Sequence, residues 1–215
     1  MEKNKTSKII AIVALVVAVL GLSLGFAAFS NTLTISSSAY VSPSDENFKV
    51  NFSTGTTAGL TGALTGSASG AASVESATLT GTTLSGIKAN FSTPGDTVTY
   101  TFYVHNTGEY DAYLNSITFE NASGQSAPKV CTAEDKANTT ASLVSAACED
   151  ISISVKVGTD AAVAGSIASI SGHKLSKSSY EPVVVTIAYA ADGDRADGNF
   201  NISFGDLKLV YSTVD

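Results

Sequence analysis

The 215-residue chain contains no tryptophan, one methionine, two histidines and two cysteines, and charged residues make up only 14% of it. The scarcity of histidine and cysteine removes most of the side chains that serve as general bases, nucleophiles or soft metal ligands. Lys and Arg number 12 against 19 Asp and Glu, so nucleic acid is not expected as a partner, because its phosphates require clustered cations. Composition therefore favours a structural or binding role.

The usual sequence motifs of catalysis are also missing from the β-rich part of the chain. His105 and His173 lie far apart, and neither stands in the His-Glu-x-x-His spacing of a zinc hydrolase. One serine, Ser23, lies in a Gly-x-Ser-x-Gly sequence, but this sequence ends the N-terminal apolar run and does not follow a strand, as the turn that carries a catalytic serine would. We predict that the protein is not an enzyme and that both histidines are ordinary strand-end or loop residues.

The N-terminal segment, residues 1–28, indicates export. Three lysines lie within its first eight residues, and Ile9–Leu24 is an unbroken apolar run. Small residues follow and permit cleavage, yet the apolar stretch, counted on to Phe29, approaches the roughly 20 residues that span a bilayer. The segment is either a removed signal peptide or a retained hydrophobic helix. We expect an extracellular or cell-surface location, with the export machinery and signal peptidase as partners and membrane contact before or without cleavage.

Residues 29–46 are predicted to be an extended arm. Leu33 and Ile35 alternate with polar residues within Asn31–Val41, which is typical of a weak strand. Residues 47–215 are predicted to form a single β-sandwich domain. Its Ser/Thr/Gly/Ala-rich segment, residues 53–86, is either a surface loop with short edge strands or a set of strands that pack against a neighbouring subunit.

Several segments alternate apolar and polar residues with the period of two that half-buried strands show. They are Phe48–Phe52, Thr97–Val104, Tyr113–Phe119, Ile151–Val157, Val183–Tyr189, Phe200–Phe204 and Leu207–Tyr211. One break in phase within Tyr113–Phe119 would suit a β-bulge, and another bulge is expected at Gly205–Asp206. Ala161–Ile170 is the only candidate for a short helix in this part. We predict an all-β fold, a jelly-roll or Greek-key β-sandwich preceded by one N-terminal hydrophobic helix.

The stretch Pro94–Phe119 (PGDTVTYTFYVHNTGEYDAYLNSITF) resembles a core found in secreted bacterial and archaeal β-sandwiches. It is similar to the TasA and camelysin group of biofilm-matrix proteins, and also to immunoglobulin-like surface repeats. The resemblance to the first group implies fibres built by donor-strand exchange, in which the arm of one subunit completes the sheet of the next. Leu33 and Ile35 would then be the anchoring side chains. Camelysin has been classed as a metalloprotease, but this sequence lacks the closely spaced zinc ligands that such an activity requires.

Three functions remain open at this point. The first is an extracellular structural protein, a subunit that polymerises with copies of itself into a surface fibre or biofilm matrix. The second is a membrane-anchored adhesin or binding module. The third is a pilin-like subunit whose hydrophobic helix packs in a filament core.

Cys131 and Cys148 are predicted to form a disulfide, because they are the only two cysteines and an exported protein meets an oxidising environment in which disulfides form. A loop of this size is stabilised by roughly 3 kcal/mol in the chain-entropy model.

The segment Asp192–Asn199 gathers oxygen ligands of the type that calcium prefers. The candidate ligands are Asp192, Asp194, Asp197 and Asn199, and no other cofactor is expected. The alternative is a solvated hairpin loop between the last two strands.

Five asparagines begin Asn-x-Ser/Thr sequences and are candidates for glycosylation if the organism modifies asparagine. They are Asn51, Asn90, Asn121, Asn138 and Asn201.

Overall fold

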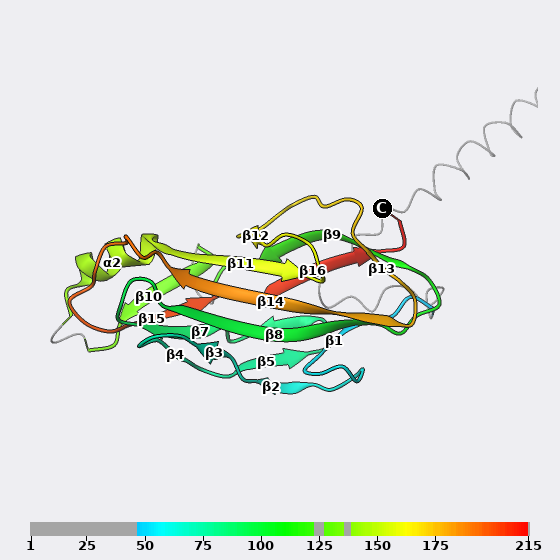
Figure 1. Cartoon of the computed structure of the whole chain (residues 1–215), viewed down its shortest axis with the longest axis horizontal. Coiled ribbons are helices and arrows are strands. Elements are labelled where there is room, and N and C mark those ends of the chain that lie inside the picture. Colours follow the sequence, from blue (N-terminus) through cyan, green and yellow to red (C-terminus); the bar gives the residue numbers. More distant parts are fainter. Residues whose placement is uncertain (1–46, 123–126, 136–138, 215) are drawn as a thin grey trace, which may run out of the picture. The chain divides into compact units, whose positions relative to one another are not determined.

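The computed structural model describes residues 47–122, 127–135 and 139–214 (Figure 1). The predicted signal or helix segment, the arm with Leu33 and Ile35, and Asn138 lie outside these residues. Within the described ranges, no helix has both the length and the apolar character needed to cross a membrane.

Strands are the main regular structure of the described part, and every pair of neighbouring strands is antiparallel. The first sheet has the order β1-β8-β14-β11-β12, and β3 also pairs with β8. Its strands are β1 (Val50–Ser53), β3 (Ser67–Ala68), β8 (Thr97–Asn106), β11 (Ile151–Val157), β12 (Val163–Ala164) and β14 (Ser179–Tyr189). The predicted all-β class is confirmed.

Two further sheets complete the fold. The second has the order β13-β9-β16-β6-β5-β2 and the third the order β10-β15-β7-β4. The second contains β2 (Gly62–Leu64), β5 (Ala77–Thr80), β6 (Thr83–Ser85), β9 (Ala112–Phe119), β13 (Lys174–Leu175) and β16 (Leu207–Ser212). The third contains β4 (Ser73–Val74), β7 (Lys88–Phe91), β10 (Lys129–Ala133) and β15 (Phe200–Phe204).

The alternating sequences dictate which side chains form the core. In β8, Tyr100 and Phe102 are fully buried, whereas the threonines between the buried positions face the outside. In β14, Val185 and Ile187 are buried in the same way, and the two strands pair over ten residues. Buried residues of all three sheets form one hydrophobic cluster, so the fold is sandwich-like, with side chains interdigitated between its layers.

β15 and β16 follow one another along the chain, and the ladder is interrupted at Gly205–Asp206. Three residues separate Ser203 from Leu207, and three also separate their partners Lys88 and Leu84. No extra residue is inserted on this side, so the predicted bulge at Gly205–Asp206 is wrong. The interruption is instead the point at which the second and third sheets meet.

The predicted irregularity in Tyr113–Phe119 is confirmed as a β-bulge. In the pairing of β9 with β16, Val210 lies opposite Ser116 and Tyr211 lies opposite Leu114. Asn115 is the extra residue, and it has no partner in β16. Its side-chain oxygen is buried and accepts no hydrogen bond from a described residue.

The two turns that flank β8 explain the Pro-Gly-Asp and Asn-Thr-Gly sequences. Asp96 is buried at the first turn, and its carboxylate accepts a hydrogen bond from the Ala71 backbone N–H at 3.1 Å. At the second turn, Asn106 is buried and donates to the carbonyls of Tyr110 and Leu175. Gly108 must be glycine, because a Cβ there would lie 2.3 Å from the Asn47 carbonyl oxygen. Both motifs therefore hold loops in place.

The only helix among the described residues is α2 (Ala141–Glu149), which the sequence did not predict. It buries Val144 and Ala147 and lies beside β10, to which the Cys131–Cys148 disulfide joins it. Lys129 of β10 donates from Nζ to the carbonyl oxygens of Cys148 and Ile151, both at 2.6 Å, and so neutralises the carbonyl end of the helix. The disulfide prediction is confirmed.

The candidate helix at Ala161–Ile170 is wrong. This stretch contains β12 and then bends at Gly165, whose positive φ of 65° interrupts any helix. Ile167 pairs through its backbone with Ile117 of β9, and Ile170 packs against the core, so the isoleucines form no helical stripe.

The Ser/Thr/Gly/Ala-rich segment 53–86 contributes more than a surface loop. It contains the short strands β2 to β6, and Leu64, Leu79 and Leu84 are buried in the core.

Candidate functional site

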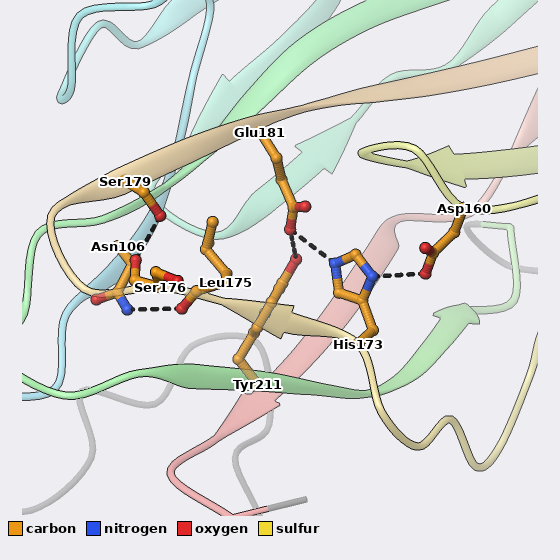
Figure 2. A network of polar contacts seen from close by, with 8 residues as sticks. All are labelled: Asn106, Asp160, His173, Leu175, Ser176, Ser179, Glu181 and Tyr211. Carbon is orange, nitrogen blue, oxygen red and sulfur yellow. Dashed lines mark hydrogen bonds and ion pairs between the residues drawn. The ribbon is translucent and has the colours of Figure 1, made fainter.

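The densest cluster of titratable side chains in the described residues surrounds His173, which lies just before β13 (Figure 2). Its side chain is 7% exposed. The ring nitrogen Nδ1 lies 2.5 Å from Asp160 Oδ2, and Nε2 lies 2.9 Å from Glu181 Oε1. The Tyr211 hydroxyl donates to the same Glu181 oxygen at 3.2 Å. We call these four residues the His173 network.

The strand pattern brings these residues together from different parts of the chain. Glu181 shares the inward face of β14 with Val183, and Tyr211 points inward from β16 in the second sheet. Asp160 follows β11 in a turn that contains Gly158. A Cβ on Gly158 would lie 2.6 Å from Glu181 Oε2, so the glycine lets the turn approach the carboxylate. The His173 network thus links two sheets and two connecting segments.

The electrostatics of this network favour a positively charged imidazole. The hydrogen bond to Glu181 is the main cause that raises the pKa of His173 from 6.5 to about 9, against the opposing effect of burial. Burial raises the pKa of Tyr211 well above its usual range, and Glu181 raises it further. At neutral pH both ring nitrogens therefore carry protons and donate to carboxylates. An imidazole in this state has no lone pair with which to accept a proton as a general base.

His173 also ends a segment that covers the outer edge of β9. We call residues 165–172, between β12 and His173, the strap. Ile167 exchanges backbone hydrogen bonds with Ile117 at 3.0 and 2.7 Å, and the Ile170 N–H donates to the Asn115 carbonyl at 2.6 Å. The Leu114 N–H then donates to the carbonyl of His173 at 3.0 Å. The strap and the first residues of β13 occupy this sheet edge along its length.

His105 lies on the outer face of the first sheet, where contacts with Gly55 and Tyr180 leave it only 5% exposed, and it is not part of the His173 network. Its Nε2 lies 3.0 Å from the Gly55 carbonyl oxygen, and its ring stacks on Tyr180 with centroids 5.1 Å apart. His105 does belong to a strand end, as predicted. The two histidines occupy separate places in the fold.

The acidic loop is used partly for contacts with neighbouring segments. The Asp197 carboxylate accepts hydrogen bonds from Thr140 at the start of α2, which lower its pKa. The Asp194 backbone N–H donates to Asp150 Oδ2 at 2.6 Å. Asp192 and Asn199 are exposed. In the part of the chain that the structure describes, no three His, Cys, Asp or Glu side chains group as metal ligands would, and the calcium site stays a prediction.

The loop is also not a hairpin, because β14 belongs to the first sheet and β15 to the third. The alternative prediction of a hairpin loop is therefore wrong.

The glycosylation candidates differ in exposure. Asn51 and Asn121 are exposed. Asn90 and Asn201 are half-buried and pair with each other, the Asn90 Nδ2 donating to Asn201 Oδ1 at 3.3 Å. Asn51 and Asn121 are therefore the more accessible of the candidates that lie within the described ranges.

The chain matches no protein-family model, no curated protein and no solved structure.

The sequence predicted His173 to be an ordinary strand-end or loop residue and therefore did not indicate this site. Its carboxylate partners lie 13 and 8 residues away in the sequence, on opposite sides of it. One signal was present: Glu181 stands at a position of its strand that alternation assigns to the core, where an unpaired carboxylate is costly.

Proposed function

We propose that this protein is an extracellular structural subunit of a surface fibre or biofilm matrix, and that it polymerises by donating a β-strand to the next copy. The donor is the arm of residues 29–46, with Leu33 and Ile35 as its anchoring side chains. The proposed topology of the sandwich is of jelly-roll or Greek-key type, and the resemblance to TasA-like proteins belongs to the same proposal. The main observation that supports strand donation is the outer edge of β10, at the end of the third sheet.

β10 pairs with β15 on one side only, as far as the described residues extend. The Gly205 N–H donates to the Pro128 carbonyl, and the Glu134 N–H donates to the Asn199 carbonyl. In an antiparallel ladder these two bonds determine which residues of β10 direct their backbone groups toward β15 and which direct them away. The N–H and C=O groups of Lys129, Cys131 and Ala133 therefore point away from β15. Such an edge accepts an added strand along its whole length, because each of these groups gains a partner.

Two further observations support an exported structural role. The Cys131–Cys148 disulfide fits an oxidising compartment. Both ring nitrogens of His173 contact carboxylates, one of Asp160 and one of Glu181, which fits stabilisation of the fold rather than proton transfer. Both the non-enzymatic role and the extracellular location remain part of the proposal.

The test uses the full chain and negative-stain electron microscopy. We expect fibres from the wild-type protein, and none after deletion of residues 31–41. The variant Ala133→Pro removes an outward N–H from β10 without touching a bond to β15, and we expect it to shorten or abolish fibres.

Thr132→Pro is the matched control for folding, because its N–H points toward β15, and it should lower the unfolding temperature. Fibres that persist in both the arm deletion and Ala133→Pro would refute the proposed assembly.

A second candidate function is a membrane-anchored adhesin or binding module. Tyr103, His105 and Tyr180 form an aromatic cluster on the outer face of the first sheet, and Tyr180 is 50% exposed. Exposed aromatic rings are common anchors at binding surfaces. Tyr180→Ala would weaken attachment of the whole protein to its target surface without changing fibre formation if this function holds.

A further inference from the structure

The aromatic cluster on the outer face of the first sheet leaves one ring open to solvent. Tyr180 of β14 lies directly opposite His105 of β8, and their rings stack with centroids 5.1 Å apart at an angle of 25°. Tyr103 meets Tyr180 edge-on, with centroids 5.8 Å apart. Tyr180 is nevertheless 50% exposed. Since His105 covers one face of the Tyr180 ring, the opposite face is the one that solvent reaches.

This ring is held in place before any ligand arrives. The His105 ring against which it packs is buried, and its Nε2 lies 3.0 Å from the Gly55 carbonyl oxygen. Pro182 lies on the same face of β14, opposite Tyr103, and its own ring fixes the backbone there. An aromatic ring fixed in this way loses little conformational freedom when a ligand stacks on it, which favours binding.

Neutral hydrogen-bonding side chains continue from the ring along the face. Asn51 of β1 is exposed and lies opposite His105, in the same row as Tyr180. The rows beyond Tyr103 carry hydroxyl groups, from Thr97, Thr99 and Thr101 of β8, Thr186 of β14 and Ser154 of β11. Each hydroxyl can both donate and accept, as the hydroxyls of a sugar do. From His105 to Thr97 the face is roughly 27 Å long, which suits a chain of sugars rather than a single one.

Charge decides which kind of polymer fits this face. Within the strands of the first sheet as the structure describes them, Lys156 of β11 is the only charged residue that points outward. A cationic polymer would therefore find no carboxylate here. The whole chain carries a formal net charge of -7, which repels an acidic polymer. An uncharged polymer remains.

We propose that this face binds a neutral polysaccharide, in which one sugar ring stacks on Tyr180 and the following sugars pair with the rows of threonine and serine hydroxyls. The π-face of an aromatic ring attracts C–H groups, so an uncharged sugar binds there without an ion pair. The inference rests on the second candidate function, because it names the ligand class of that binding surface. It is independent of fibre formation, since it uses neither the arm nor the β10 edge.

The test measures binding of the full chain to insoluble cellulose and chitin and, by affinity electrophoresis, to soluble starch, mannan and xylan. We expect the wild type to bind at least one of these polymers, and Tyr180→Ala to weaken that binding roughly tenfold or more. Tyr180→Phe keeps the stacking ring and should bind within about twofold of the wild type. Tyr180→Thr is a second loss variant with a high strand propensity, in case Tyr180→Ala folds poorly.

Tyr110→Ala is the matched control, because Tyr110 is 55% exposed but lies in the loop after β8, outside the aromatic cluster. It should bind as the wild type does. A wild type that binds none of these polymers, or equal losses in Tyr180→Ala and Tyr110→Ala, would overturn the proposal.

Attachment of the whole protein to its target surface separates this failure from that of the second candidate function. If Tyr180→Ala weakens attachment although the wild type binds no polysaccharide, the face binds a ligand of another class, such as a protein, and the ligand proposed here is wrong. If Tyr180→Ala changes neither attachment nor polysaccharide binding, the second candidate function fails as well.

Discussion

Tyr211 and Glu181 meet across the interior of the sandwich, where the tyrosine hydroxyl donates at 3.2 Å to the carboxylate oxygen that His173 contacts at 2.9 Å. One strand comes from the first sheet and the other from the second. The shared oxygen therefore ties the two layers to each other and to the end of the strap. A buried charge of this kind stabilises the fold only while its partners remain in place.

The stability of the protein should fall at alkaline pH. The pKa of His173 is raised to about 9 in the folded state from 6.5, so its contribution is fully present below pH 6.5 and is lost as the pH rises through 9. The loss is at most about 3 kcal/mol. Urea unfolding of the wild type and of His173→Gln between pH 6 and 10 measures it. The difference between the two proteins should shrink across this range, and a constant difference would contradict the assignment.

The two carboxylates should contribute unequally to the charge on His173. The hydrogen bond to Glu181 is the largest cause of the raised pKa, and the contact with Asp160 is a smaller one, in part because the Asp160 side chain is 54% exposed. NMR titration of the imidazole should show a larger fall of the His173 pKa in Glu181→Gln than in Asp160→Asn. A larger fall in Asp160→Asn would show that the exposed carboxylate dominates.

Reduction of the Cys131–Cys148 disulfide should destabilise the fold. The bond closes a loop with a sequence separation of 17, and its loss should lower the free energy of unfolding by about 3 kcal/mol. Chemical denaturation with and without reductant measures this loss. The double variant Cys131→Ala, Cys148→Ala is the control, and its stability should not respond to reductant.

Tyr100→Phe should destabilise the fold although it removes a single oxygen. The buried hydroxyl lies 2.8 Å from the Glu75 carbonyl and 2.7 Å from the Lys88 carbonyl, and burial raises the pKa of Tyr100 to about 12. A carbonyl left without a donor costs about 1–3 kcal/mol. Tyr103→Phe, on the outer face of the same strand, should change the unfolding free energy by less than about 0.5 kcal/mol. Equal effects of the two variants would contradict this account.

The sequence predicted the long strands well because apolar and polar residues alternate along most of their length. β8, β11 and β14 each place valine, isoleucine or aromatic residues on one face, and that period has no helical interpretation. The disulfide was predictable because only two cysteines exist. Both predictions depend on local or compositional information alone.

Other features could not be predicted because they depend on tertiary contacts. α2 is short, and Thr140 at its start binds Asp197 from a loop 57 residues away. The segment from β2 to β6 is rich in small residues, and its main contacts with the core are made by Leu64, Leu79 and Leu84. The His173 network is assembled from β14, β16 and two connecting segments, so no local pattern indicates it.

The central claim, assembly by strand donation from the arm, is tested most directly by electron microscopy of the full chain before and after deletion of residues 31–41, with Ala133→Pro beside it. The account predicts fibres from the wild type, no fibres from the deletion, and few or short fibres from Ala133→Pro at an unchanged unfolding temperature. Fibres of wild-type length from both variants would contradict it.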